Sequence, residues 1–122
     1  MKSNDQTNDR TREMIEGMTL FAKEFFEPAF RLLCDLLQHA HPGVRIYSML
    51  TLVQLLTEHM SVVFGTVETL KAIAGQLSTS MLQDTDPRVR RCAAVQLEKF
   101  MSALAEYGAA CKAAARQQAL RN

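Results

Sequence analysis

The sequence predicts an all-α protein, a short right-handed α-solenoid of stacked antiparallel helical hairpins with five or six helices. Three observations predict this fold class. The segment 37–52 recurs forty-five residues later as 82–97, aromatic side chains make up only 7% of the chain with no Trp, and no stretch alternates polar and apolar residues as a strand would. A repeat of about 40 to 47 residues is typical of two-helix solenoid units, each of which buries its apolar face by stacking on a neighbour.

The two copies match at specific positions. Six of the sixteen aligned residues are identical, where ordinary residue frequencies predict about one. One helical hairpin is therefore expected twice, with its two copies side by side. The identical pairs are Leu37 and Leu82, Gln38 and Gln83, Pro42 and Pro87, Val44 and Val89, Arg45 and Arg90, and Leu52 and Leu97.

The N-terminal part predicts a disordered tail followed by a first helix. Residues 1–8 are polar and lack apolar periodicity, so we expect a frayed tail and a single domain over 9–122. Apolar residues at steps of three and four then predict a helix over 9–26. Pro28 predicts a break or bend near Glu27, because proline opens a helix at its first turn or kinks it.

Two helical units follow this break, at about 28–60 and 61–107. In the first unit, a helix to about His39 is followed by a second helix that begins at Pro42, where the missing N–H of proline is no loss. Ser61 is the expected N-cap of the next helix, whose apolar stripe is Val63, Val67, Leu70, Ile73, Ala74, Leu77 and Met81.

The last boundary in the chain is the strongest. Asp86 is expected to cap the helix that starts at Pro87, because its carboxylate can accept from the unpaired amides of the first turn. That helix should run to about Tyr107, with Gly108 as its stop. The Ala-rich segment 109–121 is then either a separate capping helix or a continuation, and it flanks the repeats as 9–26 does.

Composition restricts the class of partner and the compartment. Lys and Arg number 14 against 13 Asp and Glu, and a net charge of +1 gives no large field to attract phosphate or an anionic membrane. Cys34, Cys92 and Cys111 are odd in number and widely spaced, so we expect free thiols, with Cys92 and Cys111 buried, in a reducing compartment. No leader or transmembrane pattern is present, which favours the cytoplasm, with the nucleus also open.

The turn before the last long helix resembles that of the HEAT family of helical repeats. Residues 84–94 read Asp-Thr-Asp-Pro-Arg-Val-Arg-Arg-Cys-Ala-Ala, close to the Asp-x-Asp-Pro-x-Val-Arg turn from which the second helix of such a unit begins. The copy at 39–49 is degenerate: it keeps Pro42, Val44 and Arg45, but histidines replace both aspartates and Met49 replaces Ala94. The resemblance covers about residues 28–107, and the flanking helices match no motif.

The resemblance implies structural roles for the turn residues. In this family the first Asp and the Arg six residues later help to tie adjacent turns together, which implies such a role for Asp84 and Arg90. Arg45 lacks its local acidic partner, since position 39 is a histidine, and we expect it to reach Asp84 of the neighbouring turn instead. The family also places its second helices on the concave side of the stack.

The sequence shows no pattern that carries catalysis. His39 and His41 with Cys34 are too few for a zinc centre, which needs three or four converging ligands. There is no Ser, His and Asp set, no pair of carboxylates in an apolar setting and no Gly-rich phosphate loop. We therefore expect no enzyme activity, no cofactor and no metal.

These observations predict a module or scaffold subunit that binds another protein or self-associates. Two units are few for a solenoid, and the apolar face of the 9–26 helix requires a cover. The alternative is a nucleic-acid-binding module that uses Arg45, Arg88 and Arg91, and a third possibility is a structural subunit of a large complex. The predicted partner-binding residues are Ile46, Leu50, Gln54, Glu58, Arg88, Arg91, Val95, Glu98 and Ser102.

Overall fold

The computed structural model describes residues 2–63 and 67–121, with side chains at 9–17, 20, 24–61 and 67–121. Within this part of the chain the structure is helical and has no strand, which confirms the predicted all-α class. Its elements are α1 (Lys2–Phe21), the π-helical segment η1 (Ala22–Phe26), α2 (Glu27–Leu36), α3 (Pro42–Glu58), α4 (Met60–Val63), α5 (Val67–Gln83) and α6 (Pro87–Arg121).

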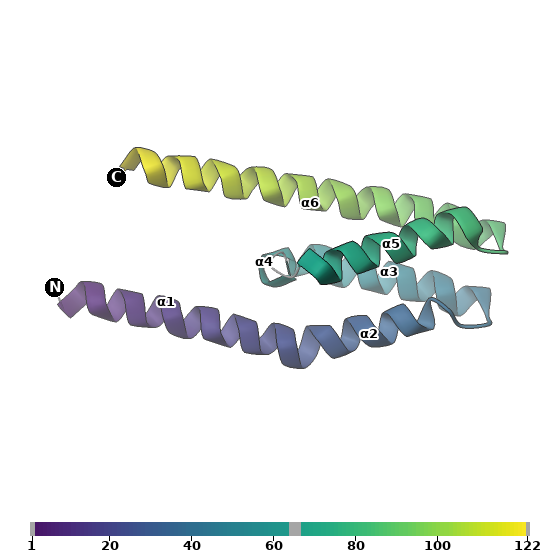
Figure 1. Cartoon of the computed structure of the whole chain (residues 1–122), viewed down its shortest axis with the longest axis horizontal. Helices are drawn as coiled ribbons and strands as arrows, with labels where there is room; N and C mark the ends of the chain where they lie inside the picture. The colour runs from purple at the N-terminus through teal and green to yellow at the C-terminus, as the bar shows by residue number, and fades with distance from the viewer. Residues whose placement is uncertain (1, 64–66, 122) are drawn as a thin grey trace.

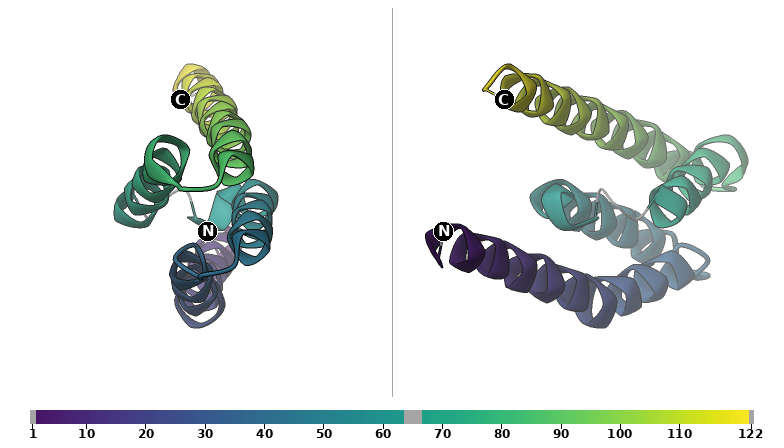
Figure 2. Two further views of the ribbon diagram at one scale, coloured as in Figure 1. Left: turned by 90° about the vertical axis from the view of Figure 1, so that its right-hand side faces the viewer. Right: turned by 60° about the vertical axis from the view of Figure 1, so that its left-hand side comes forward.

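The helices form two hairpins. α2 and α3 are antiparallel and are joined by the turn at 37–41, and α5 and α6 are joined by the turn at 84–86 (Figure 1). The view along the helices shows α2 and α3 below α5 and α6, so that the hairpins are successive layers (Figure 2). α6 packs against both α3 and α5, and α3 and α6 run in the same direction. The segments that begin at Pro42 and Pro87 are therefore parallel neighbours.

The predicted break near Glu27 is confirmed. The chain passes through the π-helical turn η1 before α2 starts at Glu27, and Pro28 lies in the first turn of α2, directly after this wider turn. α1 and α2 consequently meet at a visible bend (Figure 1). α1 leads away from the α2–α3 hairpin toward the end of the molecule at which α6 also ends (Figure 1).

Three boundaries differ from the sequence predictions. α1 already begins at Lys2, where a frayed tail was expected, and no Gly or Pro interrupts it before Gly17. α6 continues through Gly108 to Arg121, because one glycine costs about 1 kcal/mol and the alanines after it favour the helix. Ser61 lies inside α4 and not at its N-cap position, while residues 64–66, where the next helix was expected to continue, are outside the described part.

The buried apolar residues of the described part form one core between the hairpins. Its largest fully buried side chains come from α3, α5 and α6, and Phe26 and Phe30 extend it toward α1 with ring centroids 5.6 Å apart. His59, at the C-terminal end of α3, packs its ring against Phe26 at 4.9 Å. The fully buried set is Met49, Leu52, Leu56, Ile73, Leu77, Val89 and Phe100.

Several residues expected to be buried are exposed. On α1 and η1 these are Met14, Ile15 and Phe25, whereas Phe26 of the same predicted apolar face is buried, and the side chains of Met18, Phe21 and Ala22 lie outside the described set. Val67 is 53% exposed at the start of α5, and the side chain of Val63 is outside the described set. Cys111, in the C-terminal half of α6, is also exposed, whereas Cys34 and Cys92 are half-buried free thiols.

None of the described helices has the length and apolar character needed to cross a membrane.

Candidate functional site

The turn before α6 is built from hydrogen bonds to two aspartates. Asp86 Oδ1 accepts from the backbone N–H of Arg88 at 2.8 Å, which confirms Asp86 as the N-cap of α6. Two residues earlier in the same turn, Asp84 Oδ1 accepts from the N–H of Asp86 at 2.9 Å. The Arg88 guanidinium also binds the Asp86 carboxylate at 2.9 Å, and this side-chain bond, with the backbone one, lowers the pKa of Asp86 to about 2.

The turn before α3 repeats both capping bonds with histidines in place of the aspartates. His41 Nδ1 accepts from the N–H of Gly43 at 3.0 Å, and His39 Nδ1 accepts from the N–H of His41 at 3.0 Å. The in-plane lone pair of Nδ1 thus replaces a carboxylate oxygen, and it requires each ring to carry its proton on Nε2. The degenerate copy therefore keeps the geometry of the turn and loses its negative charge.

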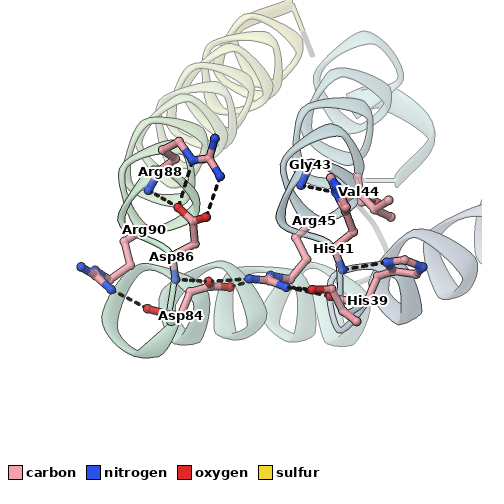
Figure 3. A network of polar contacts seen from close by, with 11 residues as sticks. His39, His41, Gly43, Val44, Arg45, Asp84, Asp86, Arg88 and Arg90 are labelled. Atoms are coloured by element: carbon pink, nitrogen blue, oxygen red, sulfur yellow. Dashed lines mark hydrogen bonds and ion pairs between the residues drawn. The ribbon is translucent and has the colours of Figure 1, made fainter.

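An ion pair joins the two turns. Arg45 Nε and Nη2 each donate to an Asp84 carboxylate oxygen at 3.0 Å, in a bidentate pair whose side chains are only 12% and 9% exposed (Figure 3). Arg45 Nη1 also donates to the carbonyls of His39 at 2.8 Å and Ala40 at 3.0 Å. The predicted contact between Arg45 and Asp84 is confirmed. This ion pair fixes the start of α3 relative to the start of α6.

Arg90 repeats one bond of Arg45. Its Nη1 donates to the Asp84 carbonyl at 2.6 Å, six residues back, as Arg45 does to the His39 carbonyl. The two guanidinium groups differ in the surface that their remaining N–H groups face. Arg45 lies between the two hairpins, whereas Arg90 lies on the side of its turn away from α3 (Figure 3).

A groove between α3 and α6 collects part of the predicted binding surface. We call it the α3/α6 groove; it has a volume of about 380 Å³ and is lined by Leu50, Val53, Gln54, Thr57, Gln96 and Lys99. Beside it, a second depression on α6 is lined by Val95, Glu98, Lys99, Ser102, Ala103 and Glu106. Lys99 lines both, so the two hollows form one continuous surface.

The other predicted binding residues lie outside the α3/α6 groove. Ile46 is half-buried and packs against the core, Glu58 accepts a hydrogen bond from Gln54 at 3.0 Å, and Arg91 is exposed near the start of α6. Arg88 is exposed but bound to Asp86. Periodicity placed these residues on the outer sides of α3 and α6, yet it did not show which of them border the contact between the helices.

Sequence reasoning missed Lys99, the residue shared by both hollows. The signal was available in the repeat, because Lys99 follows Gln54 by the same forty-five residues that separate Leu50 from Val95. A mapping of the first helix face onto the second copy by this offset would have selected Lys99 in place of Glu98.

Neither family models, nor curated proteins, nor solved structures show a match to this chain. Function is therefore inferred from the geometry of the turns and grooves.

Proposed function

We propose that this chain is a short right-handed α-solenoid of the HEAT type that acts as a non-catalytic adaptor. The two hairpins are its stacked units, and another protein binds along the α3/α6 groove and the depression beside it. The support for the fold is the recurrence of the same turn bonds at the same repeat positions, together with the parallel contact of α3 and α6.

The observation that carries the binding surface is a pair of exposed apolar residues. Leu50 is 38% exposed and Val95 is 50% exposed, and the two occupy the same position in the two copies. Exposed apolar side chains that recur in this way form a row across parallel helices, and such a row is what the apolar centre of a protein interface needs.

The polar rim of the α3/α6 groove indicates the chemistry of the partner. Lys99 lines the groove together with two amide side chains, the exposed Gln54 of α3 and the buried Gln96 of α6. A partner segment with an apolar side chain between Leu50 and Val95 and a carboxylate beside Lys99 would match both features. We therefore expect an amphipathic, acidic segment of a protein.

The nucleic-acid alternative has less support from the geometry. Arg45 is 12% exposed and both of its carboxylate-facing nitrogens are bound to Asp84. Arg88 is paired with Asp86, and of the three proposed arginines Arg91 is left as the exposed cation without such a pair in the described part of the chain. Phosphate binding gains its strength from several free cations acting together.

Affinity capture with quantitative mass spectrometry tests this function. The wild-type protein, Leu50→Glu and the matched control Leu120→Glu, an exposed leucine near the end of α6, serve as baits in extracts of cells that express the chain. We expect a protein that is retained by the wild type and the control and lost with Leu50→Glu, because a buried charge in the interface centre has no partner.

Circular dichroism and thermal melting confirm that each bait is folded. The proposal fails if Leu50→Glu captures the same proteins as the control. Binding of short duplex DNA by the wild type at low salt, weakened by Arg91→Gln, would favour the nucleic-acid function instead.

A further inference from the structure

The second hairpin leaves open the face that the first hairpin has covered. In the first copy, α5 and α6 bury a set of apolar residues at the end of α2 and along α3: Leu37 (3% exposed), Met49 (0%), Leu52 (0%) and Leu56 (0%). Their equivalents forty-five residues later are Leu82, Ala94, Leu97 and Met101. Leu82 is 71% exposed and Met101 is 51% exposed, although Leu37 and Leu82 are the same residue in the same repeat position.

The polar part of this face is also open. Arg45 is the repeat equivalent of Arg90, and its guanidinium meets the Asp84 carboxylate of the next turn in a bidentate pair. Arg90 makes the equivalent bond to its own turn, to the Asp84 carbonyl, and its guanidinium lies on the side away from α3 (Figure 3). No carboxylate in the described part of the chain pairs with it. A guanidinium has five donors, and most of those of Arg90 remain for a ligand.

We propose that the end face formed by Leu82, Arg90, Ala94, Leu97 and Met101 docks a helical hairpin of another protein whose inter-helix turn carries an Asp or Glu. The carboxylate pairs with Arg90 as Asp84 pairs with Arg45, and the helices cover the apolar residues as α5 and α6 cover α2 and α3. This end face is separate from the α3/α6 groove and goes beyond the function proposed above.

Charge argues against a second copy of this chain as the occupant. Stacking two copies head to tail places the N-terminal hairpin of one on the end face of the other, so that position 39 meets Arg90. His39 stands at that position where the second copy has Asp84, and its Nδ1 is already engaged by the His41 N–H. Tyr47, 73% exposed, also stands where the covering surface of α6 has the smaller Cys92. The first hairpin of this chain therefore lacks the carboxylate that would pair with Arg90, and its Tyr47 side chain is too large for close packing on the end face.

The same comparison supplies a probe for the test. The variant with His39→Asp and Tyr47→Ala gives the first hairpin the acid and the space of the second. Adding Met101→Glu blocks the end face of the probe itself. A mixture of this probe with wild-type protein can then form a one-to-one complex but no polymer. Met101 is 51% exposed, and circular dichroism and thermal melting of Met101→Glu alone check that the block leaves the fold intact.

Sedimentation velocity measures the outcome. We expect wild-type protein alone, and wild type mixed with Met101→Glu, to remain monomeric, and wild type mixed with the probe to form a heterodimer. Arg90→Met in the wild-type member should weaken that heterodimer by about a hundredfold, because it leaves the introduced carboxylate buried without a partner.

Three results would overturn the proposal. Self-association of the wild-type protein that Met101→Glu abolishes would make a second copy the occupant. Failure of the folded probe to bind the wild type would show that an acidic hairpin does not fit the end face. A heterodimer that is insensitive to Arg90→Met would remove the carboxylate from the recognition. Because Leu50 is not part of the end face, Leu50→Glu should leave the heterodimer intact whether or not the groove function holds.

Discussion

Removal of Arg45 is the perturbation that most directly probes how the two turns are held together. The change Arg45→Met deletes the guanidinium from the pair, in which the Asp84 side chain is 9% exposed, and leaves that carboxylate with the hydrogen bond from the Asp86 N–H. Breaking a buried ion pair by removing one partner costs about 3–5 kcal/mol. Because this pair lies at the end of the helices, where water can approach, we expect the lower limit, about 3 kcal/mol.

Urea unfolding followed by circular dichroism measures this loss. With a urea dependence of about 1–3 kcal/mol per molar for a small domain, a loss of about 3 kcal/mol lowers the unfolding midpoint by about 1–3 M. The matched control is Arg88→Met, which breaks the other Arg–Asp pair of the same turn at an exposed position and should leave the midpoint nearly unchanged.

A double-mutant cycle separates the ion pair from other effects of the substitution. Replacing both partners with apolar side chains, as in Arg45→Met with Asp84→Leu, removes the uncompensated charge, so the double variant should be more stable than the sum of the single losses predicts by about 1–3 kcal/mol. Equal midpoint shifts for Arg45→Met and Arg88→Met, or strictly additive losses in the cycle, would refute the reasoning that this pair joins the hairpins.

Three further predictions concern single sites. An NMR titration should give the Asp86 carboxyl a pKa of about 2 instead of 3.8, and Arg88→Met should raise this pKa. Because the pKa is lower in the folded state than in the unfolded state, the stability that this carboxylate contributes is complete above about pH 4 and is lost as the pH falls toward 2. Gly75→Ala should stabilise the protein by up to about 1 kcal/mol in urea unfolding, since the added methyl meets no described atom within 4 Å and alanine favours the helix; a lower midpoint would show a contact that the structure lacks. Cys111 should react with a thiol reagent well before Cys34, whose pKa is raised by burial and by the nearby Asp35; equal rates would contradict their different exposure.

The repeat made the contact between the turns predictable. Because the sequence carries Asp84 with Arg90 in one copy and His39 with Arg45 in the other, the unpaired Arg45 pointed to the acid of the neighbouring turn, where the structure has it. Proline and aspartate likewise marked the start of α6, since their effect on the first helical turn is local and needs no tertiary context.

Features that depend on neighbouring helices could not be predicted from the sequence. Ala94 and Met101 are apolar and adjacent in the chain to Ala93 and Phe100, and periodicity alone predicts all four in one apolar stripe of α6; Ala93 and Phe100 are buried, but Ala94 and Met101 are exposed because no described helix covers that side of α6. It also could not tell that Ile46 packs inward while Leu50, one turn further, borders the groove. The end of α6 was wrong for a local reason and not a tertiary one. α6 continues past Gly108 because the helix propensity of the alanines after it outweighs the cost of one glycine.

Both proposed surfaces depend on α3 and α6 being parallel neighbours, and nuclear Overhauser effects in solution test this contact most directly. With methyl and side-chain assignments, cross-peaks should connect the methyl groups of Leu50 and Val53 on α3 to side-chain protons of Gln96 and Lys99 on α6, since these residues line one groove. Spectra in which the Val53 methyl groups show contacts within α3 and none to α6 would contradict the side-by-side arrangement and remove the basis of both surfaces.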